Sequence, residues 1–131
     1  MKELTKAESE IMHILWKKER AFVQDIIDDM PCPKPAYNTV STIVRILEQK
    51  GMVGHQSYGR SHCYFPLVEK EKYARGFMQK VMSSYFGNSL PKMVSFFAQQ
   101  ENLSVGEMEE IRQLMEEELR RRQDNGNSRK N

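Results

Sequence analysis

The sequence predicts a mainly α-helical protein in two parts: three helices and a β-hairpin first, then helices alone. Apolar residues recur at helical spacing along most of the chain. Two short runs of strand-prone residues, 52–57 and 63–68, flank Gly59, which favours a turn. After residue 69 every segment between turn residues has helical spacing only.

The first helix is expected at residues 5–18. Thr5 and Glu8 have the spacing of a capping box, in which each side chain binds a free backbone amide of the first turn. Ile11 and Leu15 lie four residues apart and predict one buried face.

A second, shorter helix is expected at residues 22–30, beginning with Phe22. Three prolines within residues 31–35 end it, because proline cannot continue a helix. The third helix is expected at residues 37–50 and stops at Gly51, a residue suited to the left-handed conformation that follows a helix.

The third helix has two distinct faces. Its apolar stripe consists of Val40, Ile43, Val44 and Leu47. Its opposite face is polar and consists of Asn38, Thr39, Ser41, Thr42 and Arg45. Three helices followed by a hairpin are typical of the winged helix-turn-helix, in which the third helix enters a major groove about 12 Å wide. The polar face is therefore the predicted DNA-binding surface.

Local charge supports this surface. Between residues 34 and 62 the chain has four basic residues, Lys34, Arg45, Lys50 and Arg60, against Glu48 alone. Arg60 lies at the expected hairpin tip, where a wing reaches phosphate or the minor groove. Arg60 thus joins the predicted DNA-binding residues.

Composition excludes several classes of protein. The 131 residues are 39% hydrophobic and 29% charged, with a net charge of +2. The longest apolar stretches fall far short of the ~20 residues that span a bilayer, so no membrane insertion is expected. The N-terminus lacks the pattern of a signal peptide. Two cysteines cannot form a disulfide framework, and we expect a cytoplasmic protein.

Metal binding and catalysis are not expected. His55, His62 and Cys63 are close in sequence, but neighbouring strand residues point to opposite faces, so His62 and Cys63 cannot easily share an ion. Cys32 lies between prolines, and no set of four zinc ligands is visible. No nucleophile elbow, phosphate loop or zinc-protease motif is present, so we expect neither a cofactor nor an enzyme.

The later helices, at about 72–86, 89–100 and 104–122, are rich in methionine and phenylalanine. So few residues cannot bury so many large apolar side chains, which favours a homodimer. The candidate dimerisation residues are Phe77, Phe86, Phe96, Phe97, Met108, Ile111 and Met115. The expected domains are a winged-helix DNA-binding domain at 1–68, a helical dimerisation domain at 69–124 and a disordered tail at 125–131.

Four stretches together resemble the BlaI/MecI/CopY family of bacterial repressors. They are LTKAESEIMHILWK, NTVSTIVRILEQKGMVGH, YGRSHCYFPLV and NLSVGEMEEIRQLMEE, and they extend from about Leu4 to Glu118. The resemblance implies a dimeric winged-helix repressor of resistance or stress operons that binds dyad-symmetric operators, often with TACA/TGTA half-sites. Ser41 and Ile46 stand where relatives often have arginine, so we expect a different base preference.

The resemblance also implies a mode of derepression. In the antibiotic-responsive members a membrane sensor metalloprotease triggers cleavage of an Asn-Phe bond in the dimerisation domain. In this sequence the corresponding bond is Phe96-Phe97, with phenylalanine in place of asparagine. The copper-responsive branch has a C-terminal cysteine cluster, which is missing beyond Arg122.

Two other functions fit the same pattern of elements. The polar face of the third helix could bind a protein partner instead of DNA. Alternatively, the chain could be a ligand-sensing winged-helix regulator with an effector pocket. Salt dependence of binding separates DNA from a protein partner, and thermal shifts with candidate ligands test the effector pocket.

Overall fold

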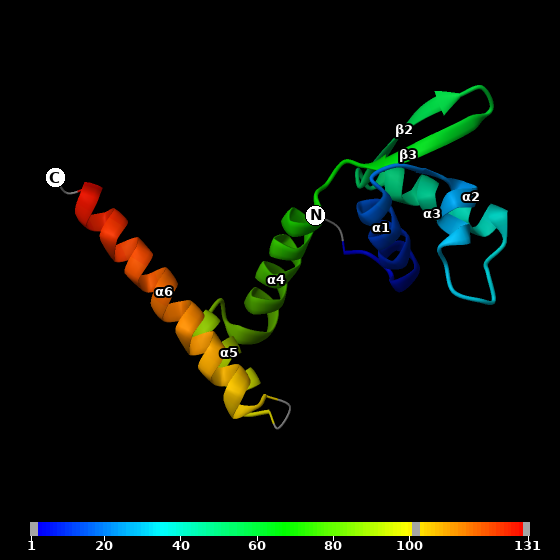
Figure 1. Ribbon diagram of the computed structural model, residues 1–131. Coiled ribbons are helices and arrows are strands. Elements are labelled where there is room, and N and C mark those ends of the chain that lie inside the picture. The colour runs from blue at the N-terminus through cyan, green and yellow to red at the C-terminus, as the bar shows by residue number, and fades with distance from the viewer. Residues whose placement is uncertain (1–2, 101–102, 130–131) are drawn as a thin grey trace. The chain divides into compact units, whose positions relative to one another are not determined.

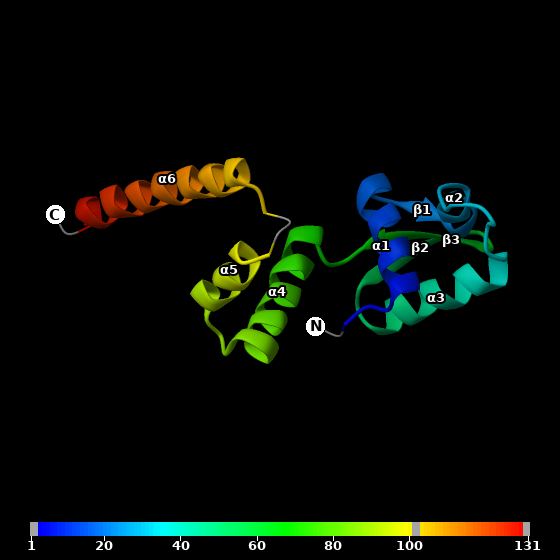
Figure 2. The same ribbon diagram turned by 90° about the horizontal axis from the view of Figure 1, so that it is seen from below.

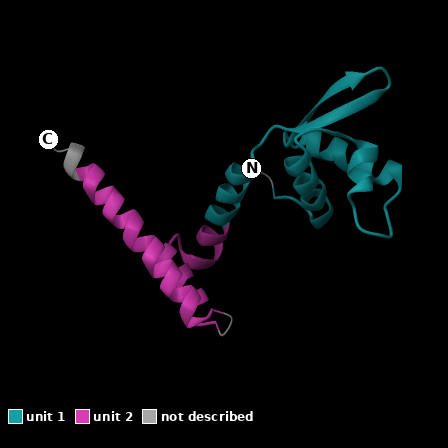
Figure 3. Cartoon of the chain, viewed as in Figure 1, with its two compact units in different colours: residues 1–80 teal, residues 81–131 magenta. Residues whose placement is uncertain are grey.

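A computed structural model describes residues 3–100 and 103–129 of the chain (Figure 1). Two compact units are present, residues 1–80 and residues 81–131 (Figure 3). No described helix combines the length and the apolar character needed to cross a membrane.

The first unit contains three helices, α1 (Lys6–Lys18), α2 (Val23–Asp28) and α3 (Tyr37–Gln49), and α1 crosses α3 (Figure 2). The predicted capping box begins α1: the Thr5 amide donates to Glu8 Oε1 at 2.8 Å, and the Glu8 amide donates to Thr5 Oγ1 at 3.2 Å. The helices enclose a core of fully buried side chains, the largest of which are Ile11, Met12, Leu15, Ile26, Val40, Val44, Leu47, Met52 and Val53.

The second helix is shorter than the sequence predicts. Phe22 belongs to a two-residue strand, β1 (Ala21–Phe22), and not to a helix. Its backbone amide donates to Asp25 Oδ2 at 3.0 Å, so Phe22 takes the capping position and α2 begins one residue later. The helix ends at Asp28, and Lys34 Nζ donates to the carbonyl oxygens of Ile27, Asp28 and Met30.

The hairpin consists of β2 (Val53–Tyr58) and β3 (Ser61–Pro66). With β1 it makes an antiparallel sheet of order β1-β3-β2, in which Ala21 pairs with Tyr64 and Val53 pairs with Pro66. Gly59 has a φ of +64° in the turn, a conformation that glycine adopts without strain. The hairpin extends beyond the helices as a wing (Figure 1).

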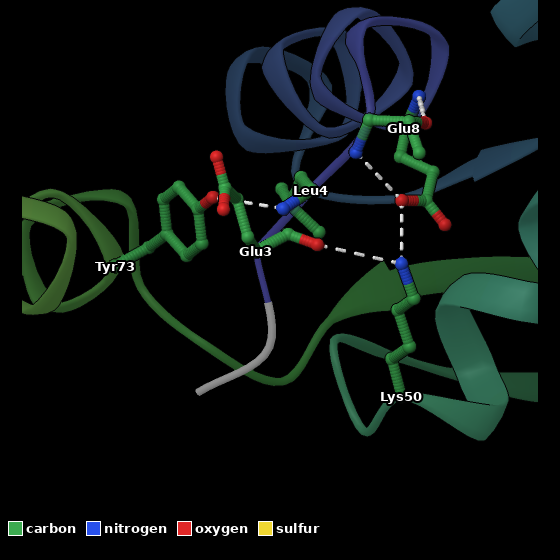
Figure 4. Close-up of polar contacts among 6 residues, drawn as sticks. Glu3, Leu4, Glu8, Lys50 and Tyr73 are labelled. Carbon is green, nitrogen blue, oxygen red and sulfur yellow. Dashed lines mark hydrogen bonds and ion pairs between the residues drawn. The ribbon is translucent and has the colours of Figure 1, made fainter. Parts of the chain in front are cut away.

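The start of α4 (Lys70–Phe86) belongs to the first unit, whereas the sequence places the domain boundary at 68/69. Trp16 Nε1 donates to the Val68 carbonyl oxygen at 2.8 Å, and the Trp16 and Tyr73 rings lie 6.0 Å apart. The Tyr73 hydroxyl accepts from the Leu4 amide at 3.2 Å (Figure 4). These contacts attach the first turns of α4 to α1.

A buried ion pair joins the beginning of α1 to the end of α3 (Figure 4). Lys50 Nζ lies 2.7 Å from Glu8 Oε1, and Glu8 is only 4% exposed. Burial by itself raises the pKa of Glu8, but hydrogen bonds from Lys50 and Thr5 and the charge of Lys50 outweigh it. The pKa of this carboxyl is therefore below its usual value, and the group is charged near neutral pH.

The second unit contains the end of α4, then α5 (Leu90–Ala98) and α6 (Val105–Arg129). Ser89 caps α5 by accepting from the Lys92 amide at 3.2 Å. A second capping box begins α6, where the Glu107 amide donates to Ser104 Oγ at 3.1 Å. The helix continues to Arg129 and so includes residues 125–129, for which the sequence predicts a disordered tail.

Salt bridges one turn apart line the surface of α6. Glu118 pairs with both Arg121 and Arg122, and these hydrogen bonds lower the pKa of Glu118 to about 2. Arg112 pairs in the same way with Glu109 and Glu116. Such pairs favour helix formation.

Candidate nucleic-acid interface

The orientation of α3 is fixed by its apolar stripe. Val40, Val44 and Leu47 are fully buried against the rest of the first unit. The opposite face must therefore point outward. Of the five predicted DNA-binding residues on this face, Ser41 is half-buried and the other four are exposed: Asn38, Thr39, Thr42 and Arg45.

Gly51 brings the wing next to α3. It has a φ of +78°, and its amide donates to the Glu48 carbonyl oxygen at 3.0 Å, which ends the helix. The Met52 amide then donates to the Leu47 carbonyl oxygen at 2.9 Å. Because the chain reverses so sharply, β2 starts at Val53 and lies against the helix that it follows.

A hollow of about 360 Å³ lies between α3 and the wing. Its helix side is a stripe of residues spaced by three or four positions, which places them on one face. Its wing side comes from one face of the hairpin, on which His55 pairs with Tyr64 and Ser57 pairs with His62. The lining residues are Val23, Tyr37, Ser41, Arg45, Glu48, His55, Arg60, His62 and Tyr64.

Several polar contacts order this hollow. On α3, Arg45 Nη2 donates to Ser41 Oγ at 3.3 Å. Across the hollow, His55 Nδ1 lies 2.5 Å from Glu48 Oε2. On the wing, His62 Nδ1 lies 3.0 Å from Ser57 Oγ. The carboxylate of Glu48 is therefore already bound to a neighbouring side chain.

Tyr64 lines the hollow and is 3% exposed. Burial raises the pKa of its hydroxyl, and the negative charge of Glu48 raises it further, while Arg45 opposes this effect. The hydroxyl stays neutral over the whole physiological range as a result. It adds no negative charge to the hollow.

The four basic residues that the sequence assigns to DNA have two different roles. Lys34 donates to three carbonyl oxygens at the end of α2, and Lys50 pairs with Glu8. Within residues 3–100 and 103–129, neither Arg45 nor Arg60 forms an ion pair. These two guanidinium groups carry the free positive charge of the surface.

Tyr37, His55 and His62 belong to this site, although the sequence did not indicate them as DNA contacts. From the sequence, His55 and His62 were candidates for metal ligands alone. The signal was available, because the hairpin register places residues 55 and 62 on one face, while Tyr37, Ser41 and Arg45 repeat every four residues on α3. The sequence alone does not show that these two faces pack against each other.

Cys63 is buried, Cys32 is exposed, and both are free thiols. In the part of the chain that the structure describes, no cluster of three or more His, Cys, Asp or Glu side chains could hold a metal ion.

The candidate dimerisation residues lie on three helices. Phe86 is half-buried and its ring lies 5.5 Å from that of Phe96. Phe77 lies on the part of α4 that belongs to the first unit, and its ring stacks on Tyr73. Six of the seven are exposed by about two-fifths or more: Phe77, Phe96, Phe97, Met108, Ile111 and Met115. Neither α4 nor α5 has a buried residue.

The predicted cleavage bond lies inside a helix. Phe96 and Phe97 are both in the last turn of α5, with 51% and 52% of their surface exposed. Their rings are 5.8 Å apart and nearly perpendicular.

Comparison with known proteins gives one consistent result. A family model described as penicillinase repressor matches residues 4–117. The methicillin resistance regulatory protein MecI of Staphylococcus aureus (strain N315) is 33% identical over 118 residues, covering 86% of this chain and 93% of that protein. The penicillinase repressor of Bacillus licheniformis is 24% identical over 123 residues, covering 93% of this chain and 96% of that protein.

Among solved structures, the chain is similar to the DNA-binding domain of the repressor BlaI, with 26% identity and a TM-score of 0.48. That similarity covers 56% of this chain and 94% of the other.

Proposed function

The chain belongs to the penicillinase repressor family of DNA-binding transcriptional repressors, which are not enzymes, and we propose that it acts as a homodimer on a dyad-symmetric operator. In this proposal each protomer places α3 in a major groove and the wing on the adjacent backbone. The contact residues are Asn38, Thr39, Ser41, Thr42 and Arg45 on α3, with Arg60 on the wing.

One observation supports the DNA contact above all others. The α3 face that points away from the core is polar, and Arg45 and Arg60, two cations without a carboxylate partner among the described residues, line one hollow beside it. A helix with such a face, flanked by cations, fits a groove edged by phosphates. Short side chains such as Asn38 can then reach base edges.

The second unit supports the homodimer. Its helices expose large apolar side chains, and α5 has no buried residue. Exposed apolar surface on this scale is covered by a partner in stable proteins. A second copy is the natural partner, because two recognition helices about 34 Å apart reach successive major grooves on one side of a duplex.

Fluorescence anisotropy tests this function directly. The protein is titrated onto a labelled duplex from its own upstream region and onto a scrambled duplex, each at two salt concentrations. Saturable binding to the native duplex, with two chains per duplex and an affinity that falls steeply with salt, supports the proposal. Equal binding to both duplexes, or binding that ignores salt, contradicts it and favours a protein partner.

For derepression, we propose cleavage or loosening of the second unit. A single protomer binds its half-site weakly. In the dimer, binding of one protomer raises the effective concentration of the other at the second half-site. Breaking the link therefore releases DNA without changing any base-contacting residue. The proposed trigger is a membrane sensor metalloprotease that cuts at Phe96-Phe97.

Mass spectrometry of the protein after incubation with the cognate sensor protease tests the cleavage site. Two fragments that divide between residues 96 and 97 support it. An intact chain, or a cut elsewhere, contradicts it. The variant Phe97→Leu, which keeps an apolar residue after the bond, is the first substitution for mapping the preference of the protease.

We further propose a cytoplasmic location and a role in antibiotic resistance. A bacterial repressor reaches its operator only in the compartment that holds the DNA. The relatives are named for methicillin resistance and penicillinase repression, so genes of β-lactam resistance are the first candidates for its regulon.

A further inference from the structure

The hollow between α3 and the wing has the charge of an anion site. Arg45 enters it from the helix and Arg60 from the hairpin turn, and neither has a carboxylate partner among the residues that the structure describes. The one carboxylate among the lining residues, Glu48, is bound to His55. Two guanidinium groups without a carboxylate partner around one hollow attract a negatively charged group.

His62 has one ring nitrogen available for such a group. Ser57 Oγ lies 3.0 Å from its Nδ1. When the serine hydroxyl donates to Nδ1, the proton of a neutral imidazole is on Nε2, which is then a donor. His62 is exposed and lines the hollow, so this donor is available to an incoming ligand.

The location of the hollow identifies the anion. A strand of duplex DNA whose major groove holds α3 and whose next groove meets the wing passes between these two elements. Contacts to its phosphates fix the register of the protein on the duplex. Arginine binds phosphate through two parallel hydrogen bonds, which suits the guanidinium of Arg45 or Arg60.

We propose that this hollow is a phosphate site in which Arg45, Arg60 and His62 bind one backbone phosphate of the DNA, while His55 is a positioning residue that keeps the Glu48 carboxylate away from it. This inference rests on the proposed function. It adds His62 as a DNA contact, and it gives Arg45 a phosphate and not a base edge as its ligand.

Anisotropy on two duplexes tests the phosphate contacts. A phosphate contact weakens binding to every sequence alike when it is lost. We therefore expect His62→Ala to weaken binding about three- to tenfold on both the native upstream duplex and a scrambled duplex. Arg45→Ala should weaken both by about tenfold or more and reduce the slope of log affinity against log salt by about one. His13→Ala, on the exposed side of α1, is the matched control and should change neither.

A different pattern of affinity losses on the two duplexes would contradict the phosphate site. A loss confined to the native duplex would mean that Arg45 or His62 reads a base edge. If His62→Ala binds both duplexes as tightly as the wild type does, His62 is not part of the phosphate site. Melting curves followed by circular dichroism verify that each variant is folded.

Rescue tests the role of His55. His55→Ala frees the Glu48 carboxylate beside the phosphate, so we expect weaker binding to both duplexes. The double variant Glu48→Gln/His55→Ala has no carboxylate to hold and should recover most of the lost affinity. A merely structural role for His55 predicts no recovery, and a double variant as weak as the single one refutes the positioning role. His55→Gln keeps a donor for Glu48 and should bind nearly as the wild type does.

The anisotropy titrations also distinguish a failure of the phosphate site from a failure of the proposed repressor function. Equal wild-type binding to both duplexes contradicts a specific operator in that region, yet the variants still report on the phosphate site. Specific wild-type binding with unaffected variants supports the repressor and refutes the site. Wild-type protein that binds neither duplex refutes both.

Discussion

Asn38 and Arg45 lie on the same exposed face of α3 but have different surroundings. Arg45 lines the hollow and donates to Ser41, whereas the Asn38 side chain is exposed one turn before Thr42, whose hydroxyl donates to the Asn38 carbonyl oxygen at 2.8 Å. A free amide at this position can bind adenine through two hydrogen bonds. Asn38 is therefore our candidate for reading sequence, and Arg45 for positioning.

The variant Asn38→Ala tests this division of roles. Each good base contact contributes about 1–3 kcal/mol of discrimination, so we expect roughly tenfold weaker binding to the native duplex. Binding to a scrambled duplex should stay the same, because no phosphate contact is lost. Competition anisotropy measures both affinities, with Gln113→Ala on α6 as the control. An equal loss on both duplexes would assign Asn38 to the backbone.

Glu8 matters for stability rather than for DNA binding. It is buried, completes the capping box of α1 and binds Lys50 at the end of α3. Glutamine at this position still offers an oxygen to the Thr5 amide, but it leaves the Lys50 ammonium without its charged partner. We expect Glu8→Gln to lower the free energy of unfolding by about 2 kcal/mol at pH 7.

The effect of Glu8 also depends on pH, in a direction fixed by its pKa. The folded pKa lies below the ordinary value of 4.5, so the charged carboxyl stabilises the fold fully above about pH 4.5. The contribution is lost as the pH falls through the folded pKa. Urea unfolding of wild type and Glu8→Gln should therefore differ most near pH 7, and the difference should shrink as the pH falls below 4.5. Glu10→Gln, exposed on the same helix, is the control and should show no such convergence.

At the scale of elements, the junction of α3 and the wing depends on Gly51. Its φ of +78° is unfavourable for any residue with a Cβ atom, although a Cβ atom there would meet no other atom within 4 Å. The only cost of Gly51→Ala is therefore backbone strain, about 1 kcal/mol of unfolding free energy. Denaturant unfolding measures it.

Gly106→Ala is the matched control for that measurement. Gly106 lies in the first turn of α6 without a positive φ, so alanine should leave stability unchanged or raise it. A destabilisation as large as that of Gly51→Ala would contradict the role given to backbone conformation. A loss well above 1 kcal/mol at position 51 would point to a contact that the glycine permits.

For the whole molecule, function depends on a second copy of the chain. Phe97 exposes about half of its surface on α5, and we place it in the dimer interface. The variant Phe97→Asp puts a charge into that apolar contact and should shift the protein to the monomer. Light scattering should then report half the wild-type mass, and binding to the native duplex should weaken by one to two orders of magnitude as avidity is lost.

Two control variants test whether the effect of Phe97→Asp is specific to this position. Gln123→Asp adds the same charge on the exposed surface of α6 and should leave a dimer. Phe97→Leu keeps an apolar side chain and should do the same. An unchanged mass for Phe97→Asp would remove this residue from the interface.

The sequence determined α1, α3 and the presence of the hairpin, because the signals for these elements are local. Capping residues, the proline-rich segment and Gly51 each act within a few positions of the backbone that they fix. The apolar stripe of α3 identified its buried face, since a period of 3.6 residues leaves only one face for the core. The resemblance to the repressor family followed from stretches of both units, the last of them NLSVGEMEEIRQLMEE.

Only the tertiary structure decided which charges are free. Lys34 and Lys50 are equivalent to Arg45 and Arg60 in a count of charge, but packing brings the two lysines to carbonyl oxygens and to Glu8. Phe22 was misassigned for the same reason, because its pairing partner Cys63 is distant in sequence. The hollow itself joins a helix face and a hairpin face, and no local pattern specifies how two such faces meet.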